Sequence, residues 1–449
     1  MIQAAEKLSM GIRIPTVSYT DTSRRDREAF SRWAPFLKDL FPMVHRELEQ
    51  IEVGELAILF RWQGRNRELP AAALLAHFDV VPPGDESRWR YPPFSGEIAD
   101  GYVWGRGAID DKLSDIAILE AVELLLTEGF VPERTVYLCF GGDEEIGGKE
   151  GASSIVNYFA NHQERLAWVL DEGGAIVDGV IDGLAGPAAM VGVAEKGHIN
   201  LRLRSSGSGG HASAPPRETA VTRLAEAIRR LQKNPFPRRM TPTVHAFLTA
   251  LGRELGGFQE LIFRLRPVTN PLILRNLAGN PRTESMVRTT QAVTMVRAGT
   301  AENVLPDAAE AVVNIRLLHG DSVEGAVERI RRVVGDPGIE VELYGSWGNI
   351  PAIEASRADH PWLTRLEEVL ARQMPGTPVL PYLMTGSTDS AAYAPVSEAI
   401  FRFVPMVMSS GELGRVHNID ERISVENIER ALHCYTDLIR TTCGVEERV

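Results

Sequence analysis

Residues 134–148, RTVYLCFGGDEEIGG, give the clearest indication of the fold. The first seven, Arg134–Phe140, are rich in β-branched and aromatic side chains and predict a buried strand. Two glycines end this strand, and the acidic run at 143–145 follows before two further glycines. In open α/β sheets, ligand sites form in loops at the carboxyl ends of strands, and this segment has the character of such a loop.

Strands and helices alternate on both sides of this stretch. Residues 70–76 (PAAALLA) predict a buried strand ending at His77, and residues 166–170 (LAWVL) predict another that runs into Asp171-Glu172. Between them, residues 114–129 carry apolar side chains at helical spacing and close on a glycine. The alternation predicts an α/β fold with a mainly parallel sheet.

Four loops of this predicted sheet carry carboxylate or imidazole groups. They are HFD at 77–79, GRGAIDD at 105–111, DEE at 143–145 and DE at 171–172. Each motif alone is common in acidic turns and helix caps. The histidine of RVHNIDE at 415–421 precedes a predicted helix, and alone it could equally belong to a helix cap. At one sheet edge their negative charges would repel unless cations neutralised them, so the joint pattern predicts a metal site. The oxygen and nitrogen ligands favour zinc, with cobalt or manganese as alternatives.

The character of the chain changes near residue 190. Residues 196–204, 309–317 and 339–343 alternate polar and apolar side chains, which predicts half-exposed strands of a smaller α+β domain. A Pro- and Leu-rich insert occupies 234–288, and α/β character returns after about residue 344. We therefore expect a main domain in two parts, residues 1–190 and 346–449, with a second domain, residues 191–345, inserted between them.

Composition narrows the classes of function. The 449 residues exceed the size at which one hydrophobic core stops growing, which supports two domains. Sixty acidic and 48 basic residues give a net charge of −12, which argues against nucleic acid as a partner. The three cysteines form no CxxC pair, and no segment has the length and hydrophobicity of a membrane span. We expect a cytoplasmic protein.

Together the motifs resemble the dizinc metallopeptidase family that includes aminoacylase, carboxypeptidase G and carboxypeptidase S. The resemblance extends over HFDVVPPG, GRGAIDDK, GGDEEIGGKEGA, LDEGGAI, ENVLP and RVHNIDE. VAEKGHINLRLRSSGSGGHASAPPRET, residues 193–219, is especially similar to the branch of carboxypeptidase S and the N-fatty-acyl-amino-acid synthase/hydrolase. The resemblance implies a zinc-exopeptidase-like catalytic domain with an inserted lid or dimerisation domain.

The resemblance also implies a set of metal ligands. Asp110 would bridge two divalent ions and be followed by a cis peptide bond. His77 and Asp171 would complete the coordination of one ion, and Glu145 and His417 that of the other.

Two further carboxylates would assist these ligands. Glu144 would be the general base, because a carboxylate beside the ions that is not a ligand takes the proton of the attacking water. Asp143 is a less favoured alternative, since strand alternation would place it on the same side as Glu145. Asp79 would accept a hydrogen bond from His77 and orient its ring.

The inserted domain and a later loop would supply substrate contacts. His211 of GGHAS would stabilise the oxyanion, reaching the site from a partner subunit or by domain closure; alternatively it is a histidine in a flexible loop. Asn303 of ENVLP would bind substrate. Arg316 is a candidate for the substrate carboxylate, although a solvated strand arginine is nearly as good an interpretation. Gly386 and Ser387 of GSTD would line the substrate, although such a string is also a common helix cap.

These features predict a metal-dependent hydrolase that cleaves an amide bond next to a free carboxylate. The substrate would be a small molecule, an N-acyl amino acid or a short peptide. A dipeptide-trimming carboxypeptidase and an N-fatty-acyl-amino-acid hydrolase differ only in pocket shape, so both remain open. The rival from another class is a non-catalytic binding protein that kept the metals. A homodimer through the inserted domain is a further possibility.

The insert at 234–288 carries ten large apolar side chains that are open to two interpretations. We favour core packing or a dimer face over a pocket for a long acyl chain. The ten are Phe247, Leu248, Leu251, Phe258, Leu261, Ile262, Phe263, Leu272, Ile273 and Leu274.

Overall fold

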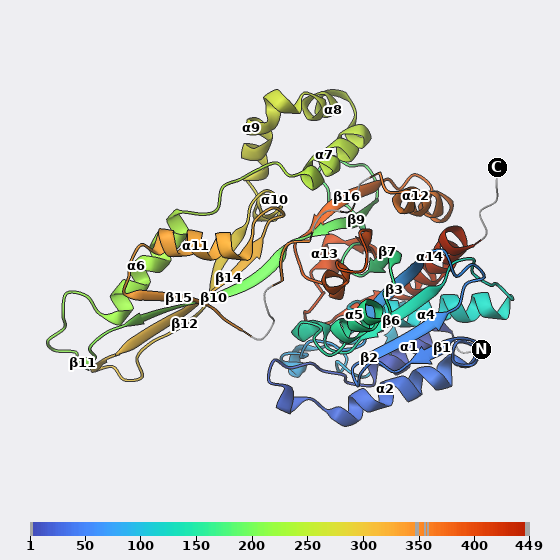
Figure 1. Cartoon of the computed structure of the whole chain (residues 1–449), viewed down its shortest axis with the longest axis horizontal. Coiled ribbons are helices and arrows are strands. Elements are labelled where there is room, and N and C mark those ends of the chain that lie inside the picture. The colour runs from blue at the N-terminus through green and yellow to red at the C-terminus, as the bar shows by residue number, and fades with distance from the viewer. Residues whose placement is uncertain (1–2, 346–349, 354–355, 357–358, 445–449) are drawn as a thin grey trace.

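Two sheets organise the protein. The computed structural model describes residues 3–345, 350–353, 356 and 359–444. It contains a ten-stranded sheet and a separate four-stranded sheet, joined through β9 and β10 (Figure 1). A group of helices, α7–α10, stands beside this junction in Figure 1.

The large sheet has the strand order β1-β2-β6-β3-β7-β17-β9-β8-β18, with β16 also paired to β9. Strands β6, β3, β7 and β17 run parallel to one another, whereas β1 and β2 form an antiparallel edge beside β6, and β17 pairs antiparallel with β9. The prediction of a mainly parallel sheet is confirmed. The strands are β1 Glu49–Ile51, β2 Ala57–Trp62, β3 Ala71–His77, β6 Val136–Gly141, β7 Leu166–Asp171, β8 Ile176–Asp178, β9 Ala188–Glu195, β16 Val379–Met384, β17 Ile400–Arg402 and β18 Val407–Ser409.

Helices cover both faces of this sheet, which explains the continuous apolar runs in the sequence. In β3, Ala72 and Leu74 face one hydrophobic cluster, whereas Ala73 and Leu75 face another on the opposite side. Helix α5 (Ala152–Asn161) packs in the second cluster. The first cluster contains residues of α1 (Ala4–Ile12), α2 (Arg27–Leu40), α3 (Pro42–Glu47), α4 (Lys112–Thr127), α12 (Pro361–Gln373) and α14 (Val425–Cys443).

The second sheet is antiparallel and has the order β12-β14-β10-β15. Helices α6 (Ala220–Lys233) and α11 (Val323–Val334) pack against one of its faces. Alternation in the sequence follows from this one-sided burial, because Leu201 and Leu203 of β10 lie in the core and Arg204 is exposed. The strands are β10 Gly197–Ser206, β12 Thr290–Arg297, β14 Ala308–Leu317 and β15 Ile339–Leu343.

The domain boundaries themselves stay predictions. The chain passes from the large to the small sheet between Glu195 and Gly197, a few residues after the predicted boundary at 190/191. At the predicted return, residues 346–349 lie outside the described residues.

The helical insert between α6 and β12 consists of α7 (Pro242–Leu255), α8 (Gly257–Arg264), α9 (Arg266–Leu277) and α10 (Pro281–Met286). Seven of the ten apolar side chains noted above pack in two small clusters, in line with the favoured interpretation: Phe247, Leu248, Leu251, Ile262, Phe263, Ile273 and Leu274. The other three, Phe258, Leu261 and Leu272, are exposed.

Candidate active site

Three neighbouring parallel strands end beside one another and deliver the acidic residues. His77 is the last residue of β3, Glu172 directly follows β7, and the 3-10 turn η3 (Glu144–Ile146) follows β6. Because β6, β3 and β7 are adjacent, and neighbouring strands lie about 4.8 Å apart, their carboxyl ends bring these side chains together.

Glu421 holds the loop that carries Asp110. The small sheet β4-β5-β19 (Glu97–Ala99, Tyr102–Trp104, Arg422–Ser424) places residue 421 next to the GRGAID segment. The buried Glu421 Oε1 accepts hydrogen bonds from the backbone N–H groups of Gly107 (3.1 Å), Ile109 (2.8 Å) and Asp110 (3.3 Å). Its other carboxylate oxygen pairs with buried Arg106. Glu421 ends the quoted RVHNIDE motif, but no local pattern there indicates a contact with residues more than 300 positions earlier.

Asp110 lies between two histidines. Its Oδ1 is 2.9 Å from His77 Nε2, and its Oδ2 is 2.9 Å from His417 Nε2. The same His417 nitrogen lies 3.1 Å from Glu145 Oε1. His417 has a left-handed backbone conformation (φ 59°), and the peptide bond from Asp110 to Asp111 is cis. The structure therefore brings together four of the five expected ligands: His77, Asp110, Glu145 and His417.

Asp171, the fifth expected ligand, points elsewhere. Its Oδ2 accepts a 2.6 Å hydrogen bond from the backbone N–H of Ser390, in the 3-10 helix η4 (Asp389–Tyr393). The adjacent Glu172 places its Oε1 3.9 Å from His77 Nε2. Successive side chains at a strand end point to opposite faces, so only one of two neighbouring acids can face the site. Here that acid is Glu172.

Asp79 connects two of the loops. His77 Nδ1 lies 3.0 Å from the backbone carbonyl of Asp79 and 3.5 Å from its Oδ1, so backbone and side chain both orient the ring. The Asp79 carboxylate also accepts hydrogen bonds from the N–H groups of Glu144 (3.1 Å) and Glu145 (3.3 Å). The HFD and DEE loops are thereby fixed relative to each other.

The argument from strand alternation about Asp143 was wrong, because residues 144–146 form a 3-10 turn and not a strand. The Asp143 carboxylate instead accepts 2.8 Å hydrogen bonds from the backbone N–H groups of Glu150 and Gly151. Glu144 Oε2 lies 4.0 Å from His77 Nε2 and thus faces the cluster.

Charges at this edge strongly influence one another. Burial raises the pKa of Glu144 well above its ordinary value, and the charges of Glu145 and Glu172 raise it further. Burial alone would raise the pKa of Asp110 too, but hydrogen bonds from His417 and His77 hold it below its ordinary value. Hydrogen bonds to Asp110 and Glu145 raise the pKa of His417 to about 10. The cluster therefore favours added positive charge.

The donor atoms fit divalent ions. Three groups have nitrogen and oxygen atoms within 4.8 Å of one another: His77 with Glu144 and Glu145, His77 with Asp110 and Glu172, and Asp110 with Glu145 and His417. Asp110 belongs to two groups that otherwise share no residue, which is the arrangement required of a bridging carboxylate. The site is thus a candidate binding site for metal ions, and its imidazole and carboxylate groups suit first-row metals.

A buried network links the GSTD loop to the domain junction. Glu195, the last residue of β9, accepts hydrogen bonds from Arg402 Nε (2.8 Å) and Thr388 Oγ1 (2.9 Å). Arg316 of β14 donates a 2.9 Å hydrogen bond from Nη1 to Ser387 Oγ, across the junction. Arg316 is half-buried, so the interpretation of a solvated arginine does not hold. Glu195 lies in the quoted stretch 193–219, but neither it nor Arg402 was assigned a role, because their contact spans 207 residues.

His211 and Asn303 lie together but far from the acidic edge. His211 ends β11 (Gly210–His211), and Asn303 directly precedes β13 (Val304–Leu305); the two strands form a ribbon at the far tip of the inserted domain (Figure 1). The N–H of Ala212 donates to the Asn303 carbonyl (3.1 Å), and both His211 and Asn303 are exposed. Within one chain in this conformation they do not meet the metal cluster.

Comparison with known proteins matches residues 73–441 to the family model described as Peptidase family M20/M25/M40. A probable carboxypeptidase S-like 2 of Dictyostelium discoideum is 36% identical over 98% of this chain and 85% of its own length. The N-fatty-acyl-amino acid synthase/hydrolase PM20D1 of Xenopus tropicalis is 37% identical over 98% of this chain and 86% of its own length.

Among solved structures, an M20 family metallo-carboxypeptidase of Sulfolobus solfataricus, Sso-CP2, superposes with a TM-score of 0.73 at 17% identity, covering 98% of this chain and 99% of that chain. The fold therefore agrees with the resemblance drawn from the motifs. With the family match over most of its length, this chain belongs to peptidase family M20/M25/M40 and is an enzyme of the metallopeptidase and amidohydrolase type.

Proposed function

We propose that this enzyme hydrolyses an amide bond next to a free carboxylate, in N-acyl amino acids or short peptides. The observation that carries the proposal is Asp110, whose two carboxylate oxygens each lie 2.9 Å from a different histidine. The relatives named carboxypeptidase S-like and N-fatty-acyl-amino acid synthase/hydrolase support the same reaction class.

Two metal ions, with zinc favoured over cobalt or manganese, would occupy the cluster. His77 and Glu172 would hold one, Glu145 and His417 the other, and Asp110 both. Glu172 replaces Asp171 in this assignment, because Asp171 is hydrogen bonded to Ser390. The chemistry that such ions supply when bound is a lowered pKa of a shared water and polarisation of the scissile carbonyl.

Glu144 is the proposed general base and acid. Its carboxylate lies at the cluster, whereas the carboxylate of Asp143 is bound to backbone N–H groups. Glu144 Oε2 would take the proton of the attacking water and return it to the leaving amine. A protein that only binds ligands has no need of a free carboxylate at this position, which favours catalysis over the binding-only alternative.

Arg316 and the GSTD loop would anchor the free carboxylate of the substrate. Burial lowers the pKa of Arg316, the charges of Glu195 and Glu144 partly offset this effect, and the guanidinium stays cationic. A guanidinium binds a carboxylate through paired hydrogen bonds, and Ser387 Oγ already fixes one of its nitrogens. Backbone N–H groups at Gly386 and Ser387 would complete the contact.

His211 would stabilise the oxyanion, with Asn303 beside it. The N–H of Ser213 donates to His211 Nδ1 (3.2 Å), so a neutral ring carries its proton on Nε2 and can donate it to an oxyanion. Because His211 lies at the distant tip, we propose that it reaches the cluster of a second copy in a homodimer, or its own by domain closure.

The test combines substrate turnover with metal analysis. Purified protein is assayed on N-acetyl-, N-lauroyl- and glycyl-amino acids, and its metal content is measured by mass spectrometry on the same sample. We expect about two ions per chain and hydrolysis of at least one substrate class, with loss of activity on chelation. The panel separates acyl-amino-acid hydrolase from dipeptidase. A metal-loaded protein inert on all three classes would contradict the proposal.

A further inference from the structure

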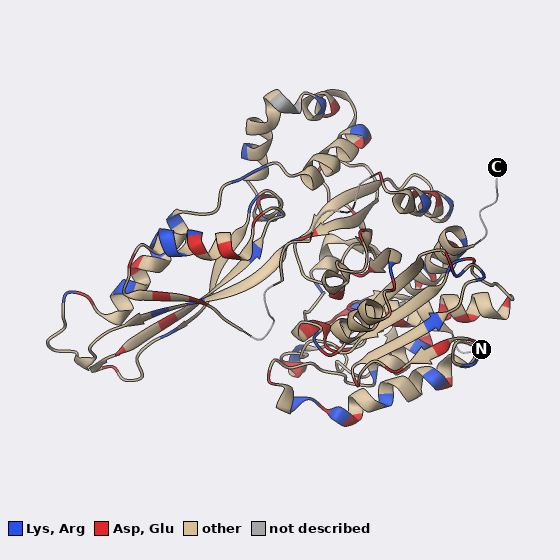
Figure 2. Ribbon diagram, viewed as in Figure 1, with Lys and Arg blue, Asp and Glu red and all other residues tan. Residues whose placement is uncertain are grey.

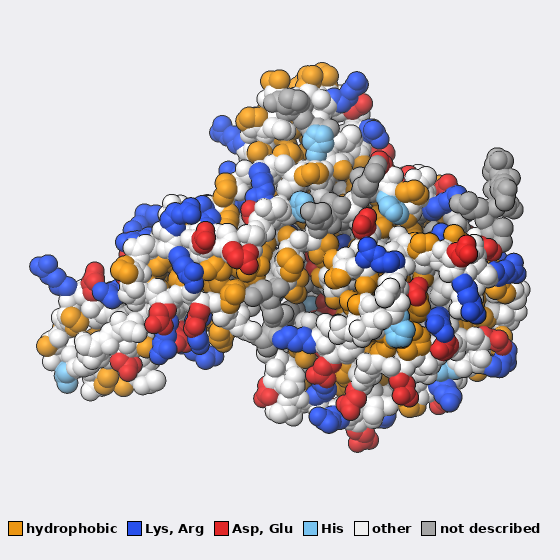
Figure 3. Space-filling view, viewed as in Figure 1, with side chains coloured by type: hydrophobic (Ala, Val, Ile, Leu, Met, Phe, Trp, Pro, Cys, Tyr) orange, Lys and Arg blue, Asp and Glu red, His pale blue; other side chains and the backbone are white. Residues whose placement is uncertain are grey.

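The outer side of α8 and α9 carries an exposed apolar stripe. It consists of Phe258 and Leu261 of α8, Leu265 at the junction of the two helices, and Val268 and Leu272 of α9, all of them exposed; the members lie three residues apart in α8 and four apart in α9. Val268 is 83% exposed and Phe258 72%. In the space-filling view, hydrophobic side chains gather at the edge formed by α8 and α9 (Figure 3).

The stripe is not an incomplete core. The opposite sides of the same helices already pack inward, through Ile262 and Phe263 of α8 and Ile273 and Leu274 of α9. A surface helix of a soluble protein normally turns polar residues outward. Helices that are apolar on the outside as well as the inside indicate that the outer side has an occupant of its own.

The insert also has an unusual charge. Residues 234–288 contain eight arginines and three glutamates, a net charge of +5 within a chain of net charge −12. Figure 2 shows blue positions along α7–α9. Arg253, Arg264, Arg275 and Arg282 are all exposed. Within the described residues, Arg253, Arg275 and Arg282 make no ion pair, and Arg264 meets only Glu260 at 4.0 Å.

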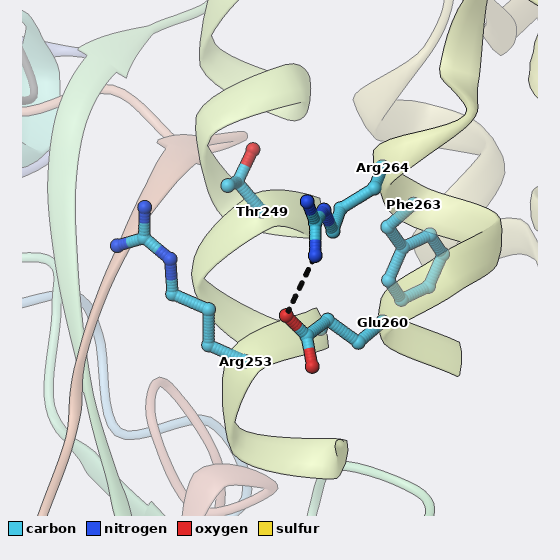
Figure 4. A pocket seen from close by; sticks show the side chains of 6 residues that line it. Thr249, Arg253, Glu260, Phe263 and Arg264 are labelled. Carbon is cyan, nitrogen blue, oxygen red and sulfur yellow. Dashed lines mark ion pairs between the residues drawn. The ribbon is translucent and has the colours of Figure 1, made fainter. Parts of the chain in front are cut away.

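A pocket with charged and apolar side chains lies next to the stripe. It has a volume of about 320 Å³ between α7 and α8, and Figure 4 shows Glu260 and Arg264 between the two helices. Arg253, Thr249 and Phe263 also line it. Glu260 faces Arg264 in this pocket, whereas the guanidinium of Arg253 beside the apolar stripe suits a layer in which anionic headgroups lie over acyl chains.

We propose that α7–α10 dock this protein on an anionic lipid surface, with the apolar stripe inserted among acyl chains and the exposed arginines at headgroup level. Exposed apolar side chains flanked by cations are the recognised requirements of an interfacial helix. A positive insert on an otherwise acidic protein would turn this edge toward a negative surface. A second copy fits less well, because a two-fold contact would oppose the same arginines across the interface.

Flotation with lipid vesicles tests the proposal. Vesicles contain phosphatidylcholine alone or an equimolar mixture with phosphatidylglycerol. We expect the wild type to bind the mixed vesicles more than about tenfold better than the neutral ones, and to lose this preference at high salt. Equal binding to both compositions, or to neither, would overturn the proposal.

Two triple variants and a matched control test whether the stripe and the arginines form the lipid-binding surface. Phe258→Ser with Val268→Ser and Leu272→Ser removes the stripe, and Arg253→Glu with Arg275→Glu and Arg282→Glu reverses the charge. Each should weaken binding to mixed vesicles more than about tenfold. Leu124→Ser with Val131→Ser and Val221→Ser changes side chains that are 37–40% exposed elsewhere and should bind like wild type.

All changed side chains are exposed, so each variant should fold like wild type. Circular dichroism melts of each variant check this. If the stripe variant binds vesicles as well as wild type, the docking surface lies elsewhere and the proposal fails. Light scattering tests the alternative occupant, a second copy of the chain, by measuring the oligomeric state. A wild-type dimer that the stripe substitutions dissociate would assign the stripe to a second copy and overturn lipid docking.

Discussion

The acidic edge of the large sheet and the tip of the inserted domain carry the two halves of the proposed site in contrasting ways. At the edge, His77 is 1% exposed and Glu144 and Glu145 are 8% exposed, and Asp79 holds all three through hydrogen bonds. At the tip, His211 and Asn303 are both exposed, His211 in a strand of two residues and Asn303 directly before the strand that pairs with it. One half is thus fixed before substrate arrives, and the other must be brought to it.

This difference follows from what each half has to do. Ligands for metal ions need their positions fixed to a fraction of an ångström, which buried strand ends and hydrogen-bonded loops provide. A donor that stabilises an oxyanion acts only during the reaction, so its arrival can coincide with closure or assembly over the substrate. The distance between the two halves is therefore compatible with catalysis. Substitutions in the two halves should have different effects.

Loss of the base in the fixed half should have the largest effect. Glu144→Gln removes the proton acceptor but keeps the shape of the turn, so we expect kcat to fall about 10²–10⁴-fold with metal content unchanged. Steady-state kinetics and metal analysis measure the two quantities. Glu150→Gln, on the exposed end of the same loop, is the matched control and should behave as wild type. Normal turnover in Glu144→Gln would remove this residue from the chemistry.

Loss of His211, in the half at the tip, should lower kcat somewhat less. His211→Ala removes one donor to the oxyanion, and we expect kcat to fall about 10²–10³-fold without loss of metal. Mixing this variant with Glu144→Gln sharpens the comparison, because a mixed dimer contains one intact pair of base and donor if the histidine comes from the partner. Recovered activity on mixing would assign His211 to the partner's site. Two variants that stay inactive together would assign it to closure within one chain.

Two adjacent acids at the end of β7 should differ in their effect on the fixed half. Glu172→Gln removes a proposed ligand, so we expect metal affinity to fall more than about 100-fold, whereas Asp171→Asn leaves the ligands in place and should cost about tenfold or less. Competition with a chelator measures both. If Asp171→Asn proves the more damaging, the original expectation from the resemblance is restored and the orientation at this strand end is wrong.

The same pair of residues illustrates what the sequence could predict. The positions of the strands could be predicted, because a parallel strand covered on both faces needs a continuous apolar run, as in Ala71–His77. Which acid faces the site was not, because the direction of Asp171 depends on the backbone of Ser390, 219 residues away. The Glu421 contact with Ile109 spans 312 residues and carries no local signal either.

The helical insert shows a second kind of limit. The large apolar residues of the insert predicted core packing or a dimer face, and Leu248 and Ile273 are indeed buried. Phe258 and Leu272 have the same character and are exposed. Periodicity cannot distinguish an inner from an outer apolar side when a helix has both, because that distinction depends on which neighbours pack against it.

The smallest expected effect concerns Lys196, which joins the two regions. It lies between β9 and β10, is 1% exposed, and donates hydrogen bonds from Nζ to the carbonyls of Ser285 and Arg288, both at 3.0 Å. Burial lowers its pKa to about 7, and the charge of Arg316 adds to the effect. In the unfolded chain a lysine titrates near its usual pKa of about 10.4, so between these two values the unfolded state binds more protons.

The free energy of unfolding should therefore rise with pH above 7, by up to about 1.4 kcal/mol per pH unit from this group. Below pH 7 both states hold the proton, and the penalty for burying the charge is present in full. Lys196→Met removes this dependence, so the stability difference between wild type and variant should grow in favour of wild type from pH 7 to pH 9, as measured by urea unfolding. Lys233→Met, at the exposed end of α6, is the control and should run parallel to wild type. A Lys196→Met curve parallel to wild type would mean that Lys196 stays charged at the junction, and that the two regions are joined through a buried cation.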